Sequence, residues 1–350
     1  MERREAFRTA TAIVPVFNGC ETLAQCLESL HRQGEGLTEI IAIDDSSWDV
    51  SPKILREFAA KDSRFNLVRH DRNQGLSRTL NEGLARATGD AVLIIQQDCE
   101  LLGSDWVQRG LAFLGEHQTC SVSGSPEYSF RDMSHVDVAF GMLRDTFFKA
   151  ESNVEELAFS EFKCDLVPRG AMLQVSFDTR FRISGEDQIA SANLRSLGHR
   201  ILRFRELEYV QRSGNTSSVI RQLRKEMVYG KTESGILLTT SLRIAFESSG
   251  SATSRRRLVN RGSAVLSASA FLAFLALVLL SANPLLWLLP LPIVMSRGVL
   301  VASRRQRVHQ SARLPNAALA QALLIMPVAD LLYSASFLSG FLAFAVAERV

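Results

Sequence analysis

The chain has 350 residues and a formal net charge of +3, which allows about two domains and gives no indication of nucleic-acid binding. Its mean hydropathy of +0.05 is high for a chain in which 22% of the residues are charged. An average of this kind hides two unlike parts: most acids and lysines precede residue 250, whereas the longest apolar runs follow residue 262. The composition therefore predicts a charged first part and an apolar second part.

The cysteines and the N-terminus indicate a reducing compartment. The five cysteines are scattered, odd in number and form no C-x-x-C pair, which argues against a disulfide framework or a zinc site. The six histidines show no ligand spacing. The N-terminal segment MERREAFR is charged and has no apolar core, so it does not resemble a signal peptide. We therefore expect the first part of the chain to stay in the cytoplasm.

Short apolar runs and helical patterns alternate through the first part of the chain. Strands are expected at residues 11–17, 39–45, 65–70 and 91–96. Helices are expected at residues 21–33, 51–60 and 76–87. Such alternation, with nearly continuous apolar strands, is typical of a parallel sheet covered by helices on both faces, so we predict an α/β fold. After residue 126 the pattern is less regular, with a strand expected at 171–177 and a helix near 188–197.

Distinctive polar residues follow three of the predicted strands. Pro15–Asn18 follows the first strand, Asp44 and Asp45 end the second, and Gln96–Asp98 follows the fourth. Ligands of parallel α/β sheets bind beyond the carboxyl ends of the strands. The sequence therefore predicts a ligand site formed by these three loops.

The last third of the chain has the composition of a membrane region. Residues 217–246 are basic and amphipathic, and residues 263–281 carry no charge and are long enough to cross a bilayer. A second stretch, 284–302, is interrupted by Pro290, Pro292 and Arg297, and residues 317–347 are long for one crossing and short for two. Two to four crossings are compatible with this pattern.

Arginine clusters predict the orientation of the first two apolar stretches. Arg255–Arg257 and Arg261 precede the first stretch, and Arg304, Arg305 and Arg307 follow the second. The positive-inside rule puts both clusters in the cytoplasm, so the two stretches would form a hairpin.

Five motifs occur in a fixed order in the first 215 residues. There is no G-x-G-x-x-G after the first strand and no P-loop. Instead the chain carries IVPVFNG, IIAIDDSSWDVSP, NQGLSRTLNEGLARATGD, LIIQQDCEL and FDTRFRISGEDQIASANLRSLGHRI. In this combination residues 10–215 resemble glycosyltransferase family 2, inverting nucleotide-sugar enzymes with the GT-A fold. The resemblance implies a Rossmann-like, mostly parallel sheet flanked by helices.

The resemblance also implies roles for individual residues. Asp187 matches the catalytic base, with Glu186 beside it, and Asp98 matches the second aspartate of the D-x-D metal motif, with Gln96 at the first position. Either Asp44 or Asp45 would hydrogen-bond the base or the ribose of the donor. The full donor-binding set expected from the motifs is Pro15, Phe17, Asn18, Asp44, Asp45, Asn73, Gly75 and Gln97.

The chemistry of sugar transfer needs two carboxylates on opposite sides of the sugar. A cation held by one carboxylate neutralises the leaving diphosphate, since Mg²⁺ or Mn²⁺ takes oxygen ligands and bridges phosphates. A second carboxylate on the acceptor side removes the proton of the attacking hydroxyl. We therefore expect a divalent cation near Asp98 and the base at Asp187.

Two carboxamides depart from the family pattern. Gln96 stands where the first aspartate of D-x-D is usual, and Gln211 stands where many members carry a histidine. Each can hydrogen-bond or coordinate through its carbonyl oxygen but adds no charge. The cation site would rely on Asp98 and on the phosphates of the donor.

The apolar part indicates an acceptor in the membrane. A polyprenyl-linked or other lipid acceptor lies in the bilayer, and the basic residues Arg221, Arg224, Lys225 and Lys231 either hold anionic lipid or only orient a surface helix. A polyprenyl monophosphate needs no base, whereas a sugar hydroxyl does. The intact Glu-Asp pair therefore favours transfer to a hydroxyl of a lipid-linked saccharide or glycolipid. A processive synthase is less favoured because Q-x-x-R-W is absent.

The sequence thus predicts three parts and leaves two alternatives open. Residues 1–215 would form a cytoplasmic glycosyltransferase domain, 216–262 interfacial linker helices, and 263–350 a multi-pass transmembrane region. The expected partners are a nucleotide-sugar donor, a lipid-linked or glycolipid acceptor and membrane lipids. The alternatives are a polyprenyl-phosphate glycosyltransferase and a catalytically weak, donor-binding membrane scaffold.

Overall fold

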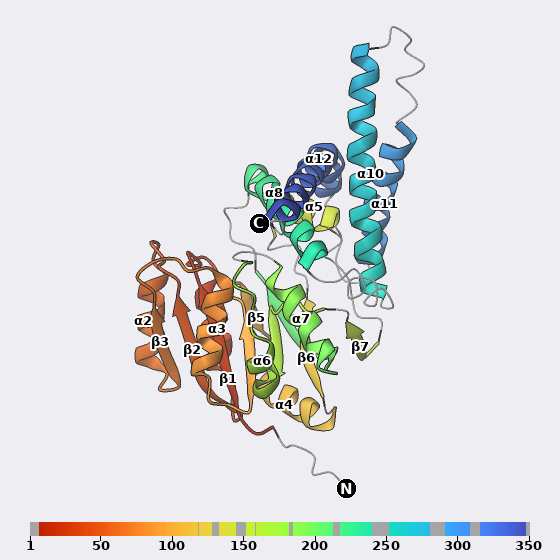
Figure 1. Cartoon of the computed structure of the whole chain (residues 1–350). Coiled ribbons are helices and arrows are strands. Elements are labelled where there is room, and N and C mark those ends of the chain that lie inside the picture. The colour runs from red at the N-terminus through yellow and green to blue at the C-terminus, as the bar shows by residue number, and fades with distance from the viewer. Residues whose placement is uncertain are drawn as a thin grey trace. The chain divides into compact units, whose positions relative to one another are not determined.

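The chain folds into two compact units, each described here by itself (Figure 1). The first unit consists of Met1–Tyr128 and Ala150–Gly214, and the second of Ser129–Lys149 and Asn215–Val350. The structure is a computed structural model. It describes residues 7–117, 119–127, 133–144, 152–157, 159–181, 185–212, 218–239, 252–280, 291–308 and 316–347.

The first half of the sheet is parallel, as the sequence predicts. Strands β1 (Ala10–Val16), β2 (Leu37–Asp44), β3 (Phe65–Arg69) and β4 (Ala91–Ile95) lie in the order β3-β2-β1-β4. Val16 is paired with Asp44, and Asp44 with Arg69, so these three strands end together. All residues of β1 and β4 are buried, because the two strands form the middle of the sheet and both of their faces are covered.

The second half of the sheet is mixed. Strand β8 (Cys164–Pro168) runs antiparallel to β4, β6 (Cys120–Glu127) is antiparallel to β8, and β9 (Arg200–Gln211) is parallel to β6. The short strands β5 (Cys99–Leu101) and β7 (Val154–Leu157) both pair antiparallel with β9. The strand expected at 171–177 is wrong, because residues Arg169–Val175 form helix α6, which buries Ala171 and Met172.

Helices cover both faces of the sheet, which confirms the two-faced packing. Helices α1 (Leu23–His31), α2 (Ser51–Lys61) and α4 (Trp106–Glu116) share one apolar cluster with the sheet. Helices α3 (Leu76–Arg86), α6 and α7 (Glu186–Ser196) share the other. Neighbouring residues of β1 alternate between the clusters, with Ile13 on the α3 side and Val14 on the α1 side.

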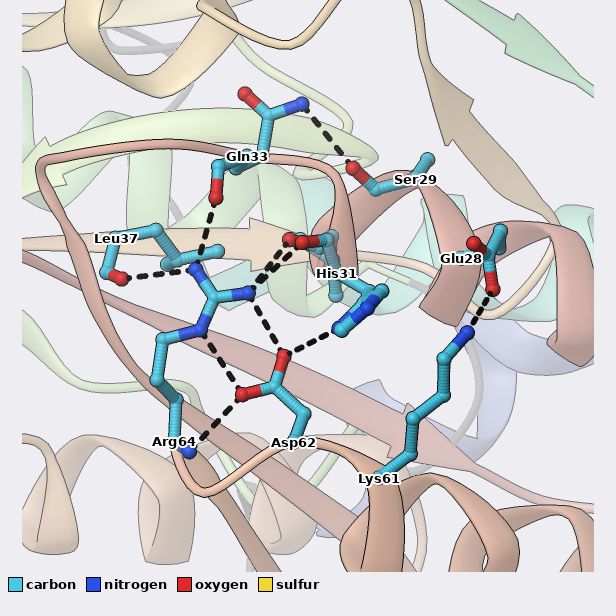
Figure 2. Close-up of polar contacts among 9 residues, drawn as sticks. Glu28, Ser29, His31, Gln33, Leu37, Lys61, Asp62 and Arg64 are labelled. Atoms are coloured by element: carbon cyan, nitrogen blue, oxygen red, sulfur yellow. Dashed lines mark hydrogen bonds and ion pairs between the residues drawn. The ribbon is translucent and has the colours of Figure 1, made fainter.

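One arginine ties the end of α1 to the start of β3 (Figure 2). The Arg64 guanidinium donates hydrogen bonds to the carbonyl oxygens of His31, Gln33 and Leu37 at 2.9–3.2 Å, and to that of Leu30 at 3.5 Å. Its Nε and one terminal nitrogen also donate to the Asp62 carboxylate at 3.0 and 2.7 Å. Leu30 and His31 are in the last turn of α1, where a helix leaves carbonyl groups without intrahelical partners.

The second unit is helical. It contains α5 (His135–Arg144), α8 (Val219–Thr239), α10 (Ala252–Leu280), α11 (Leu291–Val308) and α12 (Asn316–Ala347). Helices α8 and α12 approach closely at two glycines: a Cβ at Gly230 would lie 2.2 Å from the Tyr333 carbonyl oxygen, and a Cβ at Gly340 would lie 2.2 Å from Ser234 Oγ. Small residues at a crossing let two helix backbones come together.

Two of these helices are long and apolar enough to cross a membrane. They are Val259–Val278 within α10 and Ala317–Gly340 within α12. In the stretch expected at 284–302, residues 284–290 lie outside the described part, and Pro292–Ser303 forms a shorter apolar helix. The side chains of Arg255–Arg257, Arg304, Arg305 and Arg307, which carry the orientation prediction, also lie outside the described part.

The charge that interrupts the second apolar stretch is buried and paired. The Arg297 guanidinium donates to both carboxylate oxygens of Asp330, each at 3.2 Å, and both side chains are 3% exposed. It also donates to Asn260 Oδ1 at 2.6 Å and to the Leu143 carbonyl oxygen at 3.3 Å. One arginine on α11 therefore bonds to α12, α10 and α5.

Candidate active site

The loops after β1 and β4 are held together by one carboxamide. Gln97 Oε1 accepts a hydrogen bond from the Phe17 backbone N–H at 3.0 Å, and Gln97 Nε2 donates to the Phe17 carbonyl oxygen at 3.1 Å. The Gln97 side chain packs so closely on Gly19 that a Cβ there would lie 2.1 Å from its Oε1. Pro15 lies in β1 beyond the pairing with β4, which ends at Ile13, so its missing N–H leaves no bond to β4 unmade.

The loops after β1 and β2 are also linked. Asn18 has a φ of 48°, in the left-handed region that asparagine tolerates better than most residues. Its N–H donates to Ser47 Oγ and its Oδ1 accepts from the Trp48 N–H, both at 3.0 Å. Phe17 and Trp48 are both exposed at this edge. The structure therefore provides exposed aromatic side chains beside a bonded pair of loops.

Asp44 and Asp45 are both buried but play different parts. Asp44 Oδ1 accepts the Ser47 N–H at 2.8 Å, while its Oδ2 lies 3.3 Å from Arg69 Nε without hydrogen-bond geometry to any described residue. Asp45 Oδ1 accepts from the Gln74 N–H at 2.7 Å, and Oδ2 accepts from the Gly75 N–H at 2.8 Å. Asp44 thus retains a buried oxygen with capacity for another donor, whereas Asp45 holds the loop that precedes α3.

His70 completes the Asp45 arrangement. Its ring nitrogens lie 2.7 Å from Asp45 Oδ1 and 2.8 Å from Glu82 Oε2. Burial alone would lower the pKa of His70, but the hydrogen bonds and charges of the two carboxylates raise it above its ordinary value. Asn73 donates to the Asp45 carbonyl oxygen at 3.3 Å, and Gly75 begins α3 with a φ of 90°. The structure therefore brings Asp45 together with Asn73 and Gly75, the two residues expected in the loop before α3.

The candidate cation residues lie at the end of β4. Asp98 Oδ2 accepts a hydrogen bond from Gln211 Nε2 at 2.9 Å, and the Asp98 carbonyl oxygen accepts the Arg212 N–H at 2.7 Å. Gln96 Nε2 donates to the Phe162 carbonyl oxygen at 3.3 Å, which leaves its Oε1 as the atom able to face another group. The two carboxamides therefore have defined partners at this edge.

Glu100 belongs to an ion-pair cluster next to this loop. Its carboxylate accepts from Arg212 Nε at 2.8 Å and from the Arg212 terminal nitrogen at 2.5 Å, and it lies 3.4 Å from Arg32. Two arginines thus neutralise Glu100, which leaves Asp98 as the carboxylate that suits a cation.

The donor set at this edge fits a cation that is bound mainly by phosphate. Within the described part of the chain no three His, Cys, Asp or Glu side chains form a cation-binding group. One carboxylate and neutral carbonyl oxygens nevertheless match the way Mg²⁺ is held by one or two carboxylates together with substrate phosphates. Asp98, with Gln96 Oε1, is the pair of side chains that would hold the ion.

The other pair of carboxylates lies at the start of α7. Gly185, with a φ of 96°, precedes the helix, and Glu186 and Asp187 form its first turn. Glu186 is 7% exposed, and its Oε2 has no hydrogen-bond partner among the described residues. Burial, reinforced by the charge of Asp187, raises the pKa of Glu186 to about 8. At neutral pH Glu186 is therefore mostly protonated, and Asp187 beside it is partly exposed.

The sheet and the helices on its two faces define an α/β domain. Residues 11–158 match the family model described as Glycosyl transferase family 2. This segment contains the carboxyl ends of β1, β2, β3 and β4 and the loops that follow them. The match covers less than half of the chain, so it shows a likeness of this segment to glycosyltransferase family 2.

Two curated relatives match the same part of the chain. A PGL/p-HBAD biosynthesis glycosyltransferase of Mycobacterium bovis is 33% identical over 106 residues, which are 30% of this chain and 41% of that protein. Glycosyltransferase GlyA of Streptococcus pneumoniae is 31% identical over 139 residues, which are 40% of this chain and 19% of that protein. The chain thus matches less than half the length of each of these relatives.

A solved structure shows the same fold. The mannosyltransferase PcManGT from Pyrobaculum calidifontis, in complex with GDP-Man and Mn²⁺, aligns with a TM-score of 0.54 and 18% identity over 98% of this chain and 88% of that chain. At this identity the likeness shows the fold alone. The expected GT-A fold is thereby confirmed.

Three features of the site were not predicted from the sequence. His70 directly follows β3, as Asp45 directly follows β2, so its place at a strand end was the available signal. Trp48 stands inside one of the quoted motifs and is exposed. The turn at 160–163, whose Phe162 carbonyl bonds Gln96, carries no sequence signal, because Phe162 has a φ of 45° without being glycine.

Proposed function

We propose that the chain is a membrane-anchored, inverting glycosyltransferase that transfers a sugar from a nucleotide-sugar donor to a hydroxyl of a lipid-linked saccharide or glycolipid. The match of residues 11–158 to glycosyltransferase family 2 is the observation that carries the proposal. The carboxylate pair at the start of α7 and the two long apolar helices support its finer parts.

The donor occupies the carboxyl edge of β1, β2 and β4. The buried Asp44 Oδ2 accepts a hydrogen bond from the base or ribose, and the exposed Phe17 ring covers the base. Asp45, Asn73 and Gly75 shape the neighbouring loop, while Asn18 and Gln97 fix the loops after β1 and β4. PcManGT, which shares the fold, is seen with GDP-Man.

The residues that would hold a cation for the leaving diphosphate lie at the end of β4. Asp98 and Gln96 Oε1 would hold Mg²⁺ or Mn²⁺ there, and PcManGT is seen with Mn²⁺. When bound, this ion supplies positive charge to the departing phosphate oxygens. Gln211 keeps its hydrogen bond to Asp98 and orients the carboxylate.

The acceptor hydroxyl gives its proton to a carboxylate in the first turn of α7. Asp187 is the base, and Glu186 stays protonated beside it because of its raised pKa. A single charge in the pair avoids repulsion between neighbouring carboxylates. Direct attack from the Asp187 side, opposite the diphosphate, inverts the anomeric carbon.

The test is the identity of the product. The full chain in detergent is incubated with UDP-glucose, UDP-N-acetylglucosamine or GDP-mannose and a bacterial lipid extract, and labelled lipids are analysed by mass spectrometry before and after mild acid. We expect a lipid-linked product whose new bond survives mild acid, as a glycosidic bond to a hydroxyl does.

Two results would overturn parts of this proposal. An acid-labile sugar phosphate product that forms equally well with Asp187→Asn, but not with Asp98→Ala, would indicate a polyprenyl-phosphate acceptor. Donor binding without turnover under every condition would indicate a donor-binding scaffold.

A further inference from the structure

A buried turn lies between the loop after β4 and helix α7. This turn, Ser160–Lys163, precedes β8, and Ser160 and Phe162 are 2% and 1% exposed. On one side the Gln96 side chain donates to the Phe162 carbonyl oxygen at 3.3 Å, and the Gln96 N–H donates to the Lys163 carbonyl oxygen at 2.9 Å. The turn is therefore bonded twice to the residue that precedes Gln97 and Asp98.

On its other side the turn is clamped by a serine of α7. Ser191 Oγ accepts the Ser160 N–H at 3.0 Å and donates to the Ser160 carbonyl oxygen at 3.4 Å. Ser191 is fully buried and stands four residues after Asp187, so the two residues lie on the same face of the helix one turn apart. A hydroxyl one turn from the candidate base thus fixes α7 to the turn.

The turn is held in a strained conformation by its surroundings. Phe162 has a φ of 45°, which is costly for a bulky residue and persists only where neighbouring contacts impose it. Its ring packs edge-on against Phe177 at 5.2 Å, and its N–H donates to Ser160 Oγ at 3.2 Å. Ser160 Oγ in turn donates to the fully buried carboxylate of Asp165 on β8.

We propose that the Ser160–Lys163 turn sets the position of α7 relative to the loop after β4, and that Ser191 is a positioning residue for Asp187. The proposal rests on the proposed function, in which the two carboxylate sites act on opposite sides of one sugar. A hydrogen-bonded path then runs from Gln96 through Phe162 and Ser160 to Ser191. Its rigidity keeps the base at a fixed distance from the diphosphate side, which matters because a displacement of about 1 Å costs about 100-fold in rate.

The test compares Ser191→Ala with Ser29→Ala in the full-length chain. Ser29 is a matched control: it is a fully buried helix serine whose Oγ accepts the Leu101 N–H at 3.1 Å and donates to the Cys26 carbonyl oxygen at 2.7 Å. Both variants lose a hydroxyl that binds two backbone groups. Only Ser191→Ala releases the helix that carries Asp187.

Activity is measured as release of nucleoside diphosphate from UDP-glucose, UDP-N-acetylglucosamine and GDP-mannose. We expect Ser191→Ala to lower kcat about 10- to 100-fold with donor KM within about 3-fold, and Ser29→Ala to keep kcat within about 2-fold. Equal kcat values in the two variants would overturn the positioning role. A wild-type chain that turns over none of these donors would count against the proposed function instead.

Hydrogen exchange tests the same proposal without turnover. We expect Ser191→Ala to speed amide exchange in the first turn of α7 and in residues 96–98, and Ser29→Ala to leave both segments unchanged. Exchange in these segments that is the same in Ser191→Ala and wild type would show that the turn does not position the helix.

Discussion

Burial changes the pKa of one of the two neighbouring carboxyl groups at the start of α7, that of Glu186. Glu186 is almost fully enclosed, so its ionised form loses hydration, and the charge of Asp187 disfavours that form further. The pKa of Glu186 is therefore raised to about 8, so Glu186 is mostly protonated at pH 7. Glu186 then adds little charge beside Asp187, the residue that we propose as the base.

Replacement of Glu186 by glutamine should change how stability depends on pH. The pKa of Glu186 in the folded chain lies above its ordinary value. The contribution of Glu186 to folding stability is therefore full at acid pH and is lost as the pH rises towards about 8. Glu186→Gln removes this loss. We expect the melting temperature of the variant to gain on wild type between pH 5 and pH 9. A difference that is constant over this range would contradict the burial argument.

The carboxamide of Gln96 makes a bond that a carboxylate at the same position does not make. Gln96 Nε2 donates to the Phe162 carbonyl oxygen at 3.3 Å. An ionised aspartate has acceptor atoms only and could not donate to this oxygen. Gln96 is therefore matched to its surroundings in this chain.

At the scale of elements, the loop before α3 depends on a buried histidine. His70 lies between Asp45 and Glu82, and both carboxylates raise its pKa although burial opposes them. A raised pKa means that the stabilisation is complete below the unfolded value of about 6.5 and is lost as the pH rises through the folded value.

Removal of His70 should therefore make the melting temperature depend less on pH in this range. We expect wild type to lose more melting temperature between pH 6 and pH 8.5 than His70→Gln does. The measurement is thermal unfolding of both chains across that range in the same detergent. Identical losses in the two chains would show that His70 does not carry the effect.

The junction of α1 and β3 depends on Arg64. Its guanidinium bonds four backbone carbonyls and the Asp62 carboxylate (Figure 2). Hydrogen bonds from Arg64 hold the pKa of Asp62 well below its usual range. When buried carbonyls lose a charged donor, the free energy of unfolding falls by about 1–3 kcal/mol or more.

We expect Arg64→Ala to destabilise the chain by about 2–4 kcal/mol and Arg64→Lys to recover less than half of that, because an ammonium lacks the planar fork. Lys53→Ala is the control. Lys53 is exposed, and its ion pair with Glu57 is long, at 3.9 Å. Lys53→Ala should therefore change the free energy of unfolding by no more than about 0.5 kcal/mol. Thermal unfolding distinguishes the three variants, and equal effects of Arg64→Ala and Lys53→Ala would refute the capping role.

At the scale of the whole molecule, one buried ion pair joins four helices of the second unit. Arg297 bonds to Asp330, Asn260 and the Leu143 carbonyl oxygen. Removal of one member of a buried pair leaves an uncompensated charge, whereas replacement of both by apolar residues is often close to neutral.

We expect Arg297→Met alone to cost about 3–5 kcal/mol and the double variant Arg297→Met, Asp330→Leu to recover most of that loss. The melting temperatures of the single and double variants in detergent measure the energetic coupling between Arg297 and Asp330. A double variant that is as unstable as the sum of the two single variants would show that the pair is not coupled.

The strands and helices up to residue 96 were predictable because their apolar runs and helical periods are local. The strand expected at 171–177 was wrong because seven residues of mixed character fit either state, and packing on the sheet made them α6. The placement of α5 with the second unit depends on distant bonds such as Arg144 to Glu226, at 2.6 Å, which no local pattern contains.

The candidate site was also predictable from the sequence only in part. The positions of Asp44, Asp98 and Gln97 followed from the rule that ligands bind at strand ends. Their partners did not, since His70 and Phe162 lie 25 residues from Asp45 and 66 residues from Gln96. The strained φ of Phe162 is imposed by tertiary contacts and leaves no glycine to signal it.

We propose that this chain transfers sugars with Asp187 as the base. The most direct measurement is the rate of nucleoside diphosphate release from a nucleotide sugar by wild type and Asp187→Asn, with nucleotide affinity measured by calorimetry on the same samples. We predict a fall of at least about 100-fold in rate with nucleotide affinity unchanged within about 2-fold. An Asp187→Asn chain that turns over the donor at the wild-type rate would contradict the claim.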